Sequence, residues 1–335
     1  MKAQVIARTS NAEKFPLKII NADVPSLRDH EIEIEVSKCA VCRTDLHIVE
    51  GDLKPHRKRV IPGHQIVGRV VKIGKEVKGF RIGERVGITW INSVCGKCKF
   101  CKAGRENLCK SIKFTGYDVN GGYAQFAKVN SGFALKLPKT FDDEHAAPLL
   151  CAGIIGYRAF KLSGAGRGSK LAMFGFGGAA NITIQVAKYM GCRVFVFTRN
   201  KAHKKSAKKL GAAWVGGPDS VPKEKYDAAI IFAPAGELVV KALKHLERGG
   251  KVIIADIHMS KIPEIDYNDL YFEKSIASVA NYTRKDADEF LALAEKIQII
   301  THVTEFGLED ANKALLELKE SKINGSAVLN ITNNK

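Results

Sequence analysis

The sequence predicts an α/β plus β protein, in which a β-rich first part is followed by a doubly wound parallel sheet. Two observations support this fold class. Up to about residue 150, short apolar segments are punctuated by glycines, as expected for strands joined by tight turns in a compact barrel-like fold. Beyond that point, short apolar strands alternate with helical segments of about ten residues, which is typical of a parallel sheet covered by helices.

The expected elements follow from these two patterns. In the first part the expected strands are Gln4–Ala7, Ile32–Val36, Ile66–Ile73 and Arg85–Trp90. In the second part the expected strands are Lys170–Phe174, Arg193–Phe197, Ala228–Phe232, Lys251–Ala255 and Ile276–Val279, and the helices are Ala180–Met190, Lys201–Leu210 and Glu237–Leu246. Two helices, near Lys285–Lys296 and Leu308–Ser321, and a strand near Ala327–Ile331 complete the prediction.

The composition is that of a globular protein with enough apolar material for two cores, since 45% of its 335 residues are hydrophobic and 26% are charged. No apolar run approaches about 18 residues, so we expect no membrane-spanning helix and no membrane partner. The opening segment, MKAQVIARTS, meets charge too early for a secretory signal. Cysteines at metal-binding spacing without such a signal indicate a reducing cytoplasm.

The net charge of +18 makes nucleic-acid binding a legitimate hypothesis. The basic residues are scattered, however, apart from one stretch whose i, i+4 spacing describes a single helix face. This stretch contains Lys201, Lys204, Lys205, Lys208 and Lys209. We interpret it as a solvated face, with attraction of an anionic cofactor and nucleic-acid binding as alternatives. Because no compact basic motif carries aromatic residues, we expect no specific nucleic-acid partner.

Four cysteines within fifteen residues predict a metal site: Cys95, Cys98, Cys101 and Cys109. Zinc prefers four thiolates at about 2.3 Å, and such short spacers let one loop supply all of them. An iron–sulfur cluster is the nearest alternative, but the bacterial ferredoxin pattern closes with C-x3-C-P, whereas here seven residues precede the last cysteine. Free or disulfide-bonded thiols are the third possibility.

A glycine-rich turn predicts a dinucleotide site. The strand Lys170–Phe174 leads directly into a G-x-G-x-x-A loop and then a helix. Glycines let the backbone approach a pyrophosphate, the small sixth residue lets the helix pack on the strand, and the helix N-terminus offers N–H groups to the phosphate. The residues expected to bind the cofactor here are Gly175, Gly177, Gly178, Ala179 and Ala180.

The end of the next strand indicates which dinucleotide binds. An NAD-preferring domain usually carries Asp or Glu there, to bind the ribose hydroxyls. This chain instead has Thr198, Arg199 and Asn200, and lysines including Lys204 follow. An acidic residue would repel a 2′-phosphate, whereas a hydroxyl, a guanidinium and lysines would hold it. We therefore predict NADP(H) in preference to NAD(H).

Further metal-ligating residues lie apart in the sequence. Cys42 stands in a C-x2-C-R-T-D-L-H motif, His64 follows Pro62-Gly63, and Cys151 lies where the two patterns meet. Spacing alone does not group them. Their chemistry makes a group plausible, because two cysteines, one histidine and a water form an open catalytic zinc site.

Taken together, these motifs closely resemble the zinc-dependent medium-chain alcohol dehydrogenases (medium-chain dehydrogenase/reductase superfamily) over essentially the whole chain. Details such as CRTDLH, GFG and VFTR make it most similar to the NADPH-linked branch related to bacterial cinnamyl alcohol dehydrogenases. The resemblance implies a GroES-like catalytic domain formed by residues 1–152 and 284–335. It also implies a Rossmann cofactor domain at residues 153–283, with the active site in the cleft between them.

The resemblance also assigns roles to individual residues. Cys42, His64 and Cys151 would hold a catalytic zinc that acts as a Lewis acid, and the four clustered cysteines would hold a structural zinc. Thr44 would hydrogen-bond the substrate oxygen, and His47 would pass its proton to solvent. Asp45 would orient the ligand histidine. Arg43 lies where some family members contact the cofactor pyrophosphate.

The implied activity is hydride transfer between NADP(H) and a primary alcohol or its aldehyde, by a cytoplasmic homodimer or homotetramer with two zinc ions per subunit. A zinc-independent quinone or enone reductase, and a basic zinc-bearing nucleic-acid-binding protein, are the alternatives. Gln65 departs from the family pattern, which has Glu after the ligand histidine, so we expect a less negative site. Trp90 is expected either in the wall of a substrate pocket or in the core.

Overall fold

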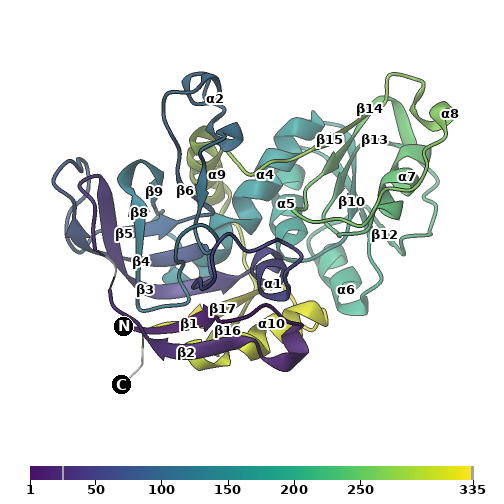
Figure 1. Ribbon diagram of the computed structural model, residues 1–335. Coiled ribbons are helices and arrows are strands. Elements are labelled where there is room, and N and C mark those ends of the chain that lie inside the picture. The colour runs from purple at the N-terminus through teal and green to yellow at the C-terminus, as the bar shows by residue number, and fades with distance from the viewer. Residues whose placement is uncertain (25, 333–335) are drawn as a thin grey trace. The chain divides into compact units, whose positions relative to one another are not determined.

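The chain divides into two compact units, each with its own sheet, in the computed structural model, which describes residues 1–24 and 26–332 (Figure 1). The first unit comprises Met1–Cys151, Thr283–Glu295 and the residues from Thr301 onward. The second comprises Ala152–Tyr282 and Lys296–Ile300. Among the described residues, no helix combines the length and the apolar character that crossing a membrane requires.

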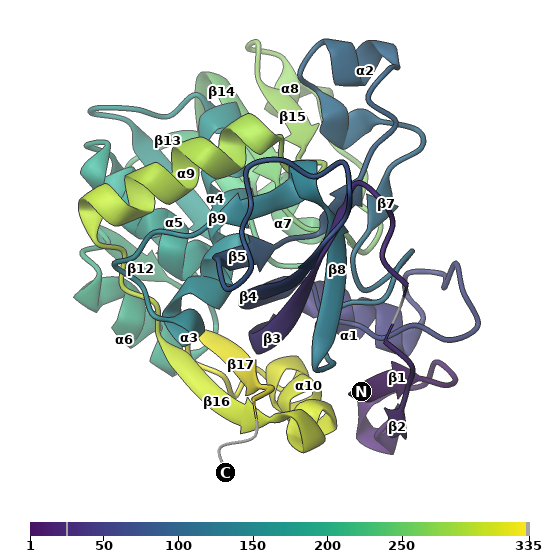
Figure 2. The same cartoon turned by 90° about the vertical axis from the view of Figure 1, so that its left-hand side faces the viewer.

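The first unit is built on a seven-stranded sheet with the order β16-β17-β3-β4-β5-β9, in which β8 also pairs with β3. Figure 2 shows β3, β4, β5 and β8 side by side in this sheet. Its strands are β3 (Glu31–Val41), β4 (Gln65–Ile73), β5 (Arg85–Ile88), β8 (Phe126–Asn130), β9 (Ala134–Lys136), β16 (Val303–Gly307) and β17 (Ser326–Asn330). Two small antiparallel pairs join β1 (Lys2–Ile6) to β2 (Leu17–Asn21) and β6 (Ile91–Ser93) to β7 (Lys113–Phe114).

The helices of the first unit are short, apart from α9. They are α1 (Arg43–Glu50), α2 (Lys99–Lys102), α3 (Asp143–Ala146), α9 (Arg284–Ile297) and α10 (Ala311–Lys319). Five 3-10 turns accompany them: η1 (Ala12–Lys14), η2 (Glu106–Leu108), η3 (Ser131–Phe133), η4 (Ala147–Leu150) and η5 (Leu308–Asp310). The helix expected at Leu308–Ser321 therefore begins as a 3-10 turn and becomes α-helical only at Ala311.

The second unit is a six-stranded parallel sheet with the order β12-β11-β10-β13-β14-β15. Its strands are β10 (Lys170–Phe174), β11 (Arg193–Phe197), β12 (Trp214–Gly216), β13 (Tyr226–Ile231), β14 (Leu246–Ile254) and β15 (Ser275–Ser278). Counted from β10, this is the 3-2-1-4-5-6 order of a doubly wound dinucleotide-binding fold, and the strand order reverses between β10 and β13. The predicted fold class is confirmed.

Helices cover both faces of the parallel sheet (Figure 1). They are α4 (Ala152–Ser163), α5 (Gly178–Tyr189), α6 (Lys201–Lys209), α7 (Glu237–Lys244) and α8 (Tyr267–Leu270). The core beneath them contains Phe174 and Phe197, whose rings stack with centroids 4.3 Å apart, together with Tyr226. These aromatic side chains come from three neighbouring strands, so they hold the carboxyl end of β10 in place.

Several segments of this unit differ from the prediction: β12 and α8 were not expected, and neither were α4 and the boundary between α7 and β14 as the structure has them. The sequence does not reveal α4, because glycines at positions 153 and 156 lower its helix propensity. The helix expected to reach Leu246 ends at Lys244, and Leu246 already pairs with Tyr226 in β14. This early start of the strand is hidden by Gly249, which has a φ of 72° and interrupts the apolar pattern.

Close packing of α4 on α5 yields a first prediction. A Cβ atom at Gly156 would lie 2.0 Å from Oγ1 of Thr183, whose hydroxyl donates to the carbonyl of Ala179 at 2.7 Å. Gly156→Ala should therefore lower the free energy of unfolding by about 1–3 kcal/mol, as overpacking does. Chemical denaturation measures the change.

Gly166→Ala is the matched control, because a Cβ atom at that position has no neighbour within 4 Å. Its free energy of unfolding should stay near the wild-type value. The additional change Thr183→Ala should recover part of the loss caused by Gly156→Ala. Equal stability of Gly156→Ala and Gly166→Ala would contradict this account of the packing.

Candidate metal and cofactor sites

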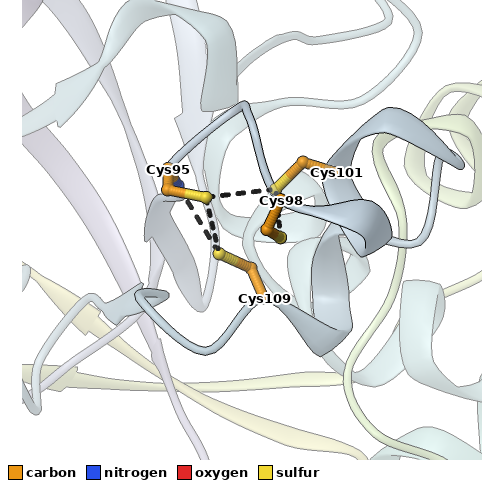
Figure 3. Close-up of side chains that lie close together, drawn as sticks. All are labelled: Cys95, Cys98, Cys101 and Cys109. Atoms are coloured by element: carbon orange, nitrogen blue, oxygen red, sulfur yellow. Dashed lines mark hydrogen bonds between the residues drawn. The ribbon is translucent and has the colours of Figure 1, made fainter.

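The four clustered cysteines point toward one another, as Figure 3 shows. The Sγ atoms of Cys98 and Cys101 are 3.5 Å apart, as are those of Cys95 and Cys109, and all four sulfurs lie within 4.8 Å of one another. Tetrahedral zinc with four sulfurs at about 2.3 Å would separate them by about 3.8 Å. All four thiols are free. The arrangement fits one zinc ion with no open coordination position.

Local backbone groups prepare some of these thiols for a metal. Backbone N–H groups of Lys97 and Cys98 lower the pKa of Cys95 to about 6, and that of Cys101 lowers the pKa of Cys98. Burial, with the nearby thiols of Cys98 and Cys109, raises the pKa of Cys101 to about 12. Because the thiolate is the ligand form, metal binding must displace the proton of Cys101.

The cysteine lobe (residues 95–109) contains only α2 and η2 as regular structure, and it projects from the sheet of the first unit in Figures 1 and 2. Glu106, which is 3% exposed, anchors it to the start of α9. Its Oε1 accepts hydrogen bonds from the backbone N and from Nε of Arg284, at 2.9 and 3.2 Å. With so little regular structure, the lobe depends on this anchor for its shape, and a metal bound by the four cysteines would fix it further.

The structure brings Cys42, His64 and Cys151 together, although they lie far apart in the sequence. Their ligand atoms are within 4.8 Å of one another. His64 is fully buried, and its Nδ1 is paired with Asp45 at 3.0 Å. Its Nε2 is also buried and has no hydrogen-bond partner in the described part of the chain. A metal ion would supply that partner, so the donor set fits zinc with a fourth position open.

The cap of α1 holds one of these ligands in place. Cys42 is the N-cap, and its Sγ accepts a hydrogen bond from the backbone N of Thr44 at 3.5 Å. In return, the Asp45 side chain accepts from the backbone N of Cys42 at 2.8 Å, which completes a capping box. Asp45 also accepts from the backbone N of Gly63 at 3.2 Å and from the Tyr123 hydroxyl at 3.3 Å.

The pKa values of the three candidate ligands are shifted in different directions when no metal is bound. A hydrogen bond from Cys151 lowers the pKa of Cys42 well below its usual value, against the effect of burial. The pKa of Cys151 is raised in turn. Burial by itself would lower the pKa of His64, but the Asp45 carboxylate, together with Cys42, outweighs burial and raises that pKa to about 10. Zinc would displace the protons on Cys151 and His64.

The two predicted proton-relay residues lie on α1 beside this site. The Thr44 hydroxyl is 3.6 Å from Sγ of Cys42, and His47 is one helical turn further along the same face. His47 is 6% exposed, and its Nδ1 is 2.8 Å from a carboxylate oxygen of Asp52. Arg43, the remaining predicted residue of this segment, is the first residue of α1 and is half-buried.

Trp90 packs directly against the ligand histidine. It is 4% exposed, and its ring meets that of His64 edge to face with centroids 4.9 Å apart. On its other side it stacks on Phe114 at 4.9 Å and on Tyr117 at 5.9 Å. Gln65, which follows His64, is 3% exposed and begins β4. The surroundings of His64 are therefore largely apolar on this side.

Sequence reasoning missed two residues of this region, Tyr123 and Asp52. Tyr123 is fully buried and reaches Asp45 across 78 residues of sequence, so no local pattern could indicate the contact. Asp52 follows Gly51, which ends α1 with a φ of 90°. That glycine is a turn signal from which the return of the chain toward His47 could have been inferred.

The glycine-rich loop makes a tight turn between β10 and α5. Gly175 has a φ of 90°, and a Cβ atom there would lie 3.1 Å from Cβ of Ala233 beyond the neighbouring strand. A Cβ atom at Gly177 would meet nothing within 4 Å, and this residue, the N-cap of α5, is exposed. Gly178 and Ala179 open α5, and Ala180 is fully buried, as a small residue at a helix–strand contact should be.

At the end of β11, the predicted cofactor residues differ in exposure. Thr198 is 6% exposed, and its backbone N donates to the carbonyl of Gly216 at 2.9 Å. Arg199 is exposed, and Lys204 is half-buried in the first turn of α6. The side-chain oxygen of Asn200 caps α6 by accepting from the backbone of Ala202 at 2.8 Å and of His203 at 3.2 Å. Positive charge therefore lies at the strand end that holds the adenosine ribose in this fold.

Comparison with known proteins agrees with these features. The family model of the alcohol dehydrogenase GroES-like domain matches residues 28–139, and that of zinc-binding dehydrogenases matches residues 178–296. A probable alcohol dehydrogenase, AdhA, from Mycobacterium tuberculosis is 44% identical over 335 residues, which cover 98% of this chain and 97% of that protein.

Solved structures are similar over their full length. CAD from Helicobacter pylori, complexed with NADP(H), is 26% identical with a TM-score of 0.88, and the match covers 100% of both chains. Acetophenone reductase from Geotrichum candidum, in complex with NAD, is 25% identical with a TM-score of 0.91, over 100% of this chain and 98% of that one. The family resemblance predicted from the motifs is confirmed, and the chain belongs to the zinc-binding alcohol dehydrogenase family.

Proposed function

We propose that this protein is a zinc-dependent alcohol dehydrogenase or aldehyde reductase that moves a hydride between NADP(H) and a primary alcohol or its aldehyde. One observation carries the proposal. The buried Nε2 of His64 lacks a hydrogen-bond partner among the described residues and lies within 4.8 Å of the sulfurs of Cys42 and Cys151, a donor set that leaves one coordination position for substrate. When bound there, zinc supplies Lewis-acid polarisation of the substrate oxygen.

The residues of the chain supply orientation and proton transfer. Thr44, whose hydroxyl is 3.6 Å from Sγ of Cys42, hydrogen-bonds the substrate oxygen and takes up its proton in alcohol oxidation. His47 receives that proton and releases it to solvent. Asp45 keeps the imidazole of His64 in the tautomer that directs Nε2 toward the two sulfurs. Trp90 and its aromatic neighbours keep this side of the site apolar, which favours an apolar substrate.

We assign residues 1–152 and 284–335 to the catalytic domain and residues 153–283 to the cofactor domain. The second zinc, held by the cysteine lobe, has a structural role, because four thiolates leave no position for substrate. Arg43 contacts the pyrophosphate of the cofactor, and Arg199 with Lys204 binds its 2′-phosphate. We further propose that the enzyme is a cytoplasmic homodimer or homotetramer.

A panel of aldehydes assayed with NADPH and NADH, on a preparation whose zinc content is measured, tests the activity. We expect NADPH-dependent reduction and about two zinc ions per chain. Removal of the zinc held by Cys42, His64 and Cys151 with a chelator should abolish turnover, and added zinc should restore turnover. Turnover that persists in zinc-free protein would instead favour the zinc-independent quinone or enone reductase.

The two metal sites should respond differently to loss of a ligand. Cys98→Ser should lower the unfolding midpoint by about 5 °C or more, because the lobe loses its metal, while the folded fraction keeps its kcat. Cys42→Ser should lower kcat by at least about 100-fold, because Lewis-acid catalysis is worth several kcal/mol. Calorimetry, zinc analysis and kinetics on the same samples separate the two roles. A Cys98→Ser enzyme of normal stability but low kcat would reverse the assignment.

Cofactor preference is tested by Arg199→Asp. Loss of a charge-assisted hydrogen bond of about 1.5–3 kcal/mol should raise the KM for NADPH by about 10- to 100-fold, with little change in the KM for NADH. The control is Lys208→Asp, the same charge reversal at an exposed position in the last turn of α6. An unchanged NADPH/NADH preference in Arg199→Asp, or an equal change in the control, would contradict a 2′-phosphate site at Arg199.

A further inference from the structure

We propose that Asp52 is a positioning residue of the proton relay, which holds the imidazole of His47 in the tautomer and orientation that the reaction uses. The inference rests on the proposed function, because it gives Asp52 a role in the reaction assigned to this site. Asp52 lies outside the C-x2-C-R-T-D-L-H motif that identifies the relay. The fold of the chain after α1 places it beside His47.

The C-terminal cap of α1 brings Asp52 back to His47. Gly51 adopts the left-handed conformation, with a φ of 90° and a ψ of 9°, and its backbone N donates to the carbonyl of His47 at 3.0 Å. The backbone N of Leu53 donates to the same carbonyl at 3.2 Å. These two bonds wrap residues 51–53 around the end of the helix. Asp52 therefore lies beside the residue five positions before it.

The two side chains of this pair differ in burial. The side chain of His47 is 7% exposed, whereas that of Asp52 is 41% exposed. Nδ1 of His47 lies 2.8 Å from Oδ2 of Asp52. The imidazole thus stands between the buried metal site and water. A carboxylate only accepts hydrogen bonds, so it selects the tautomer with a proton on Nδ1. In that tautomer Nε2 carries the lone pair that takes up a proton.

The pair also defines the proton transfer. In alcohol oxidation, the hydroxyl proton of the substrate reaches Nε2 of His47 through Thr44, and the imidazolium that forms is stabilised by the Asp52 carboxylate. One proton then leaves to water, and the neutral imidazole returns. In aldehyde reduction the same proton moves in the opposite direction. Asp52 keeps its charge throughout and holds the ring in place.

Other charged groups packed around α1 are engaged with each other. Glu50 accepts from Nζ of Lys319 at 2.7 Å and from the backbone N of Ala12 at 2.9 Å. Lys319, on α10, also pairs with Glu13, on η1. Both elements pack against α1. Asp45, on α1 itself, is turned toward His64. Asp52 is thus the carboxylate that the structure pairs with His47.

The chain contains a matched control for this pair. His56 and Asp118 form a second pair with the same Nδ1-to-carboxylate distance of 2.8 Å, but this histidine side chain is 55% exposed. It lies outside the proposed relay. The change Asp118→Asn removes the carboxylate charge from a histidine pair outside the relay, and the amide oxygen of Asn can still accept the hydrogen bond that Asp118 receives from the backbone N of Phe114. Asp52→Asn makes the same chemical change within the relay.

A double-mutant cycle tests whether Asp52 acts through His47. Asp52→Asn should lower kcat for alcohol oxidation by about 10- to 100-fold, within the range for general acid–base catalysis, with little change in KM. In the His47→Gln background, the same change should cost no more than about twofold, because the partner is gone. Asp52→Glu should recover part of the loss, and Asp118→Asn should have no effect in either background. Independent, multiplicative losses would overturn the inference.

Nitrogen-15 NMR of histidine-labelled protein tests the pair without turnover. Resonances of His47 are identified by their absence in His47→Gln. We expect its neutral ring to carry the proton on Nδ1 in the wild type and in Asp118→Asn, and to lose this preference in Asp52→Asn. A wild-type ring protonated on Nε2, or a tautomer unaffected by Asp52→Asn, would overturn the inference. Absence of dehydrogenase activity together with the expected tautomers would instead refute the proposed function.

Discussion

The buried carboxylate of Asp45 is the constraint on which the candidate active site depends. It is fully buried and is paired by four groups: the backbone N of Cys42 at 2.8 Å, the backbone N of Gly63 at 3.2 Å, Nδ1 of His64 at 3.0 Å and the Tyr123 hydroxyl at 3.3 Å. A buried charge is tolerated only when it is satisfied in this way. The positions of these partners are therefore constrained, and two of them belong to the proposed metal ligands Cys42 and His64.

Glycines make this convergence possible. A Cβ atom at Gly63, which has a φ of 94°, would lie 2.4 Å from the ring of Tyr123, and one at Gly122 would lie 2.5 Å from Ile66. At Gly121 it would lie 2.0 Å from the carbonyl of Gly63. The segment before the ligand histidine thus packs backbone against backbone. The Asp45 carboxylate accepts the hydrogen bonds, and the glycines, which have no side chain, leave the space in which these groups can approach it.

What could be predicted from the sequence was mainly local. The observed strands Lys170–Phe174 and Arg193–Phe197 agree with the predicted ones residue for residue, because turn residues at both ends of an apolar run mark where the strand begins and ends. The helix α1 was missed because its N-cap is Cys42 rather than the Ser, Thr, Asp or Asn that marks most helix starts. The four clustered cysteines lie in one loop, so their spacing was enough to predict a metal site. The grouping of Cys42 with Cys151 depends on the whole sheet, and it was predicted only from the family resemblance.

Among the described residues, four histidines pair through Nδ1 with a carboxylate at 2.7 to 3.0 Å, and their surroundings give them different chemistry. One of them, His145 with Asp142, lies at the exposed start of α3. His64 and Asp45 are both fully buried and pair at 3.0 Å, so this pair fixes the imidazole of a proposed metal ligand. His56 and Asp118 pair at 2.8 Å with the imidazole largely in water, where such a contact contributes little. Between them, His47 is buried while Asp52 is exposed. Among these described pairs, that of His47 and Asp52 joins a buried imidazole to an exposed carboxylate, and the proposed relay between the candidate site and solvent needs such a connection.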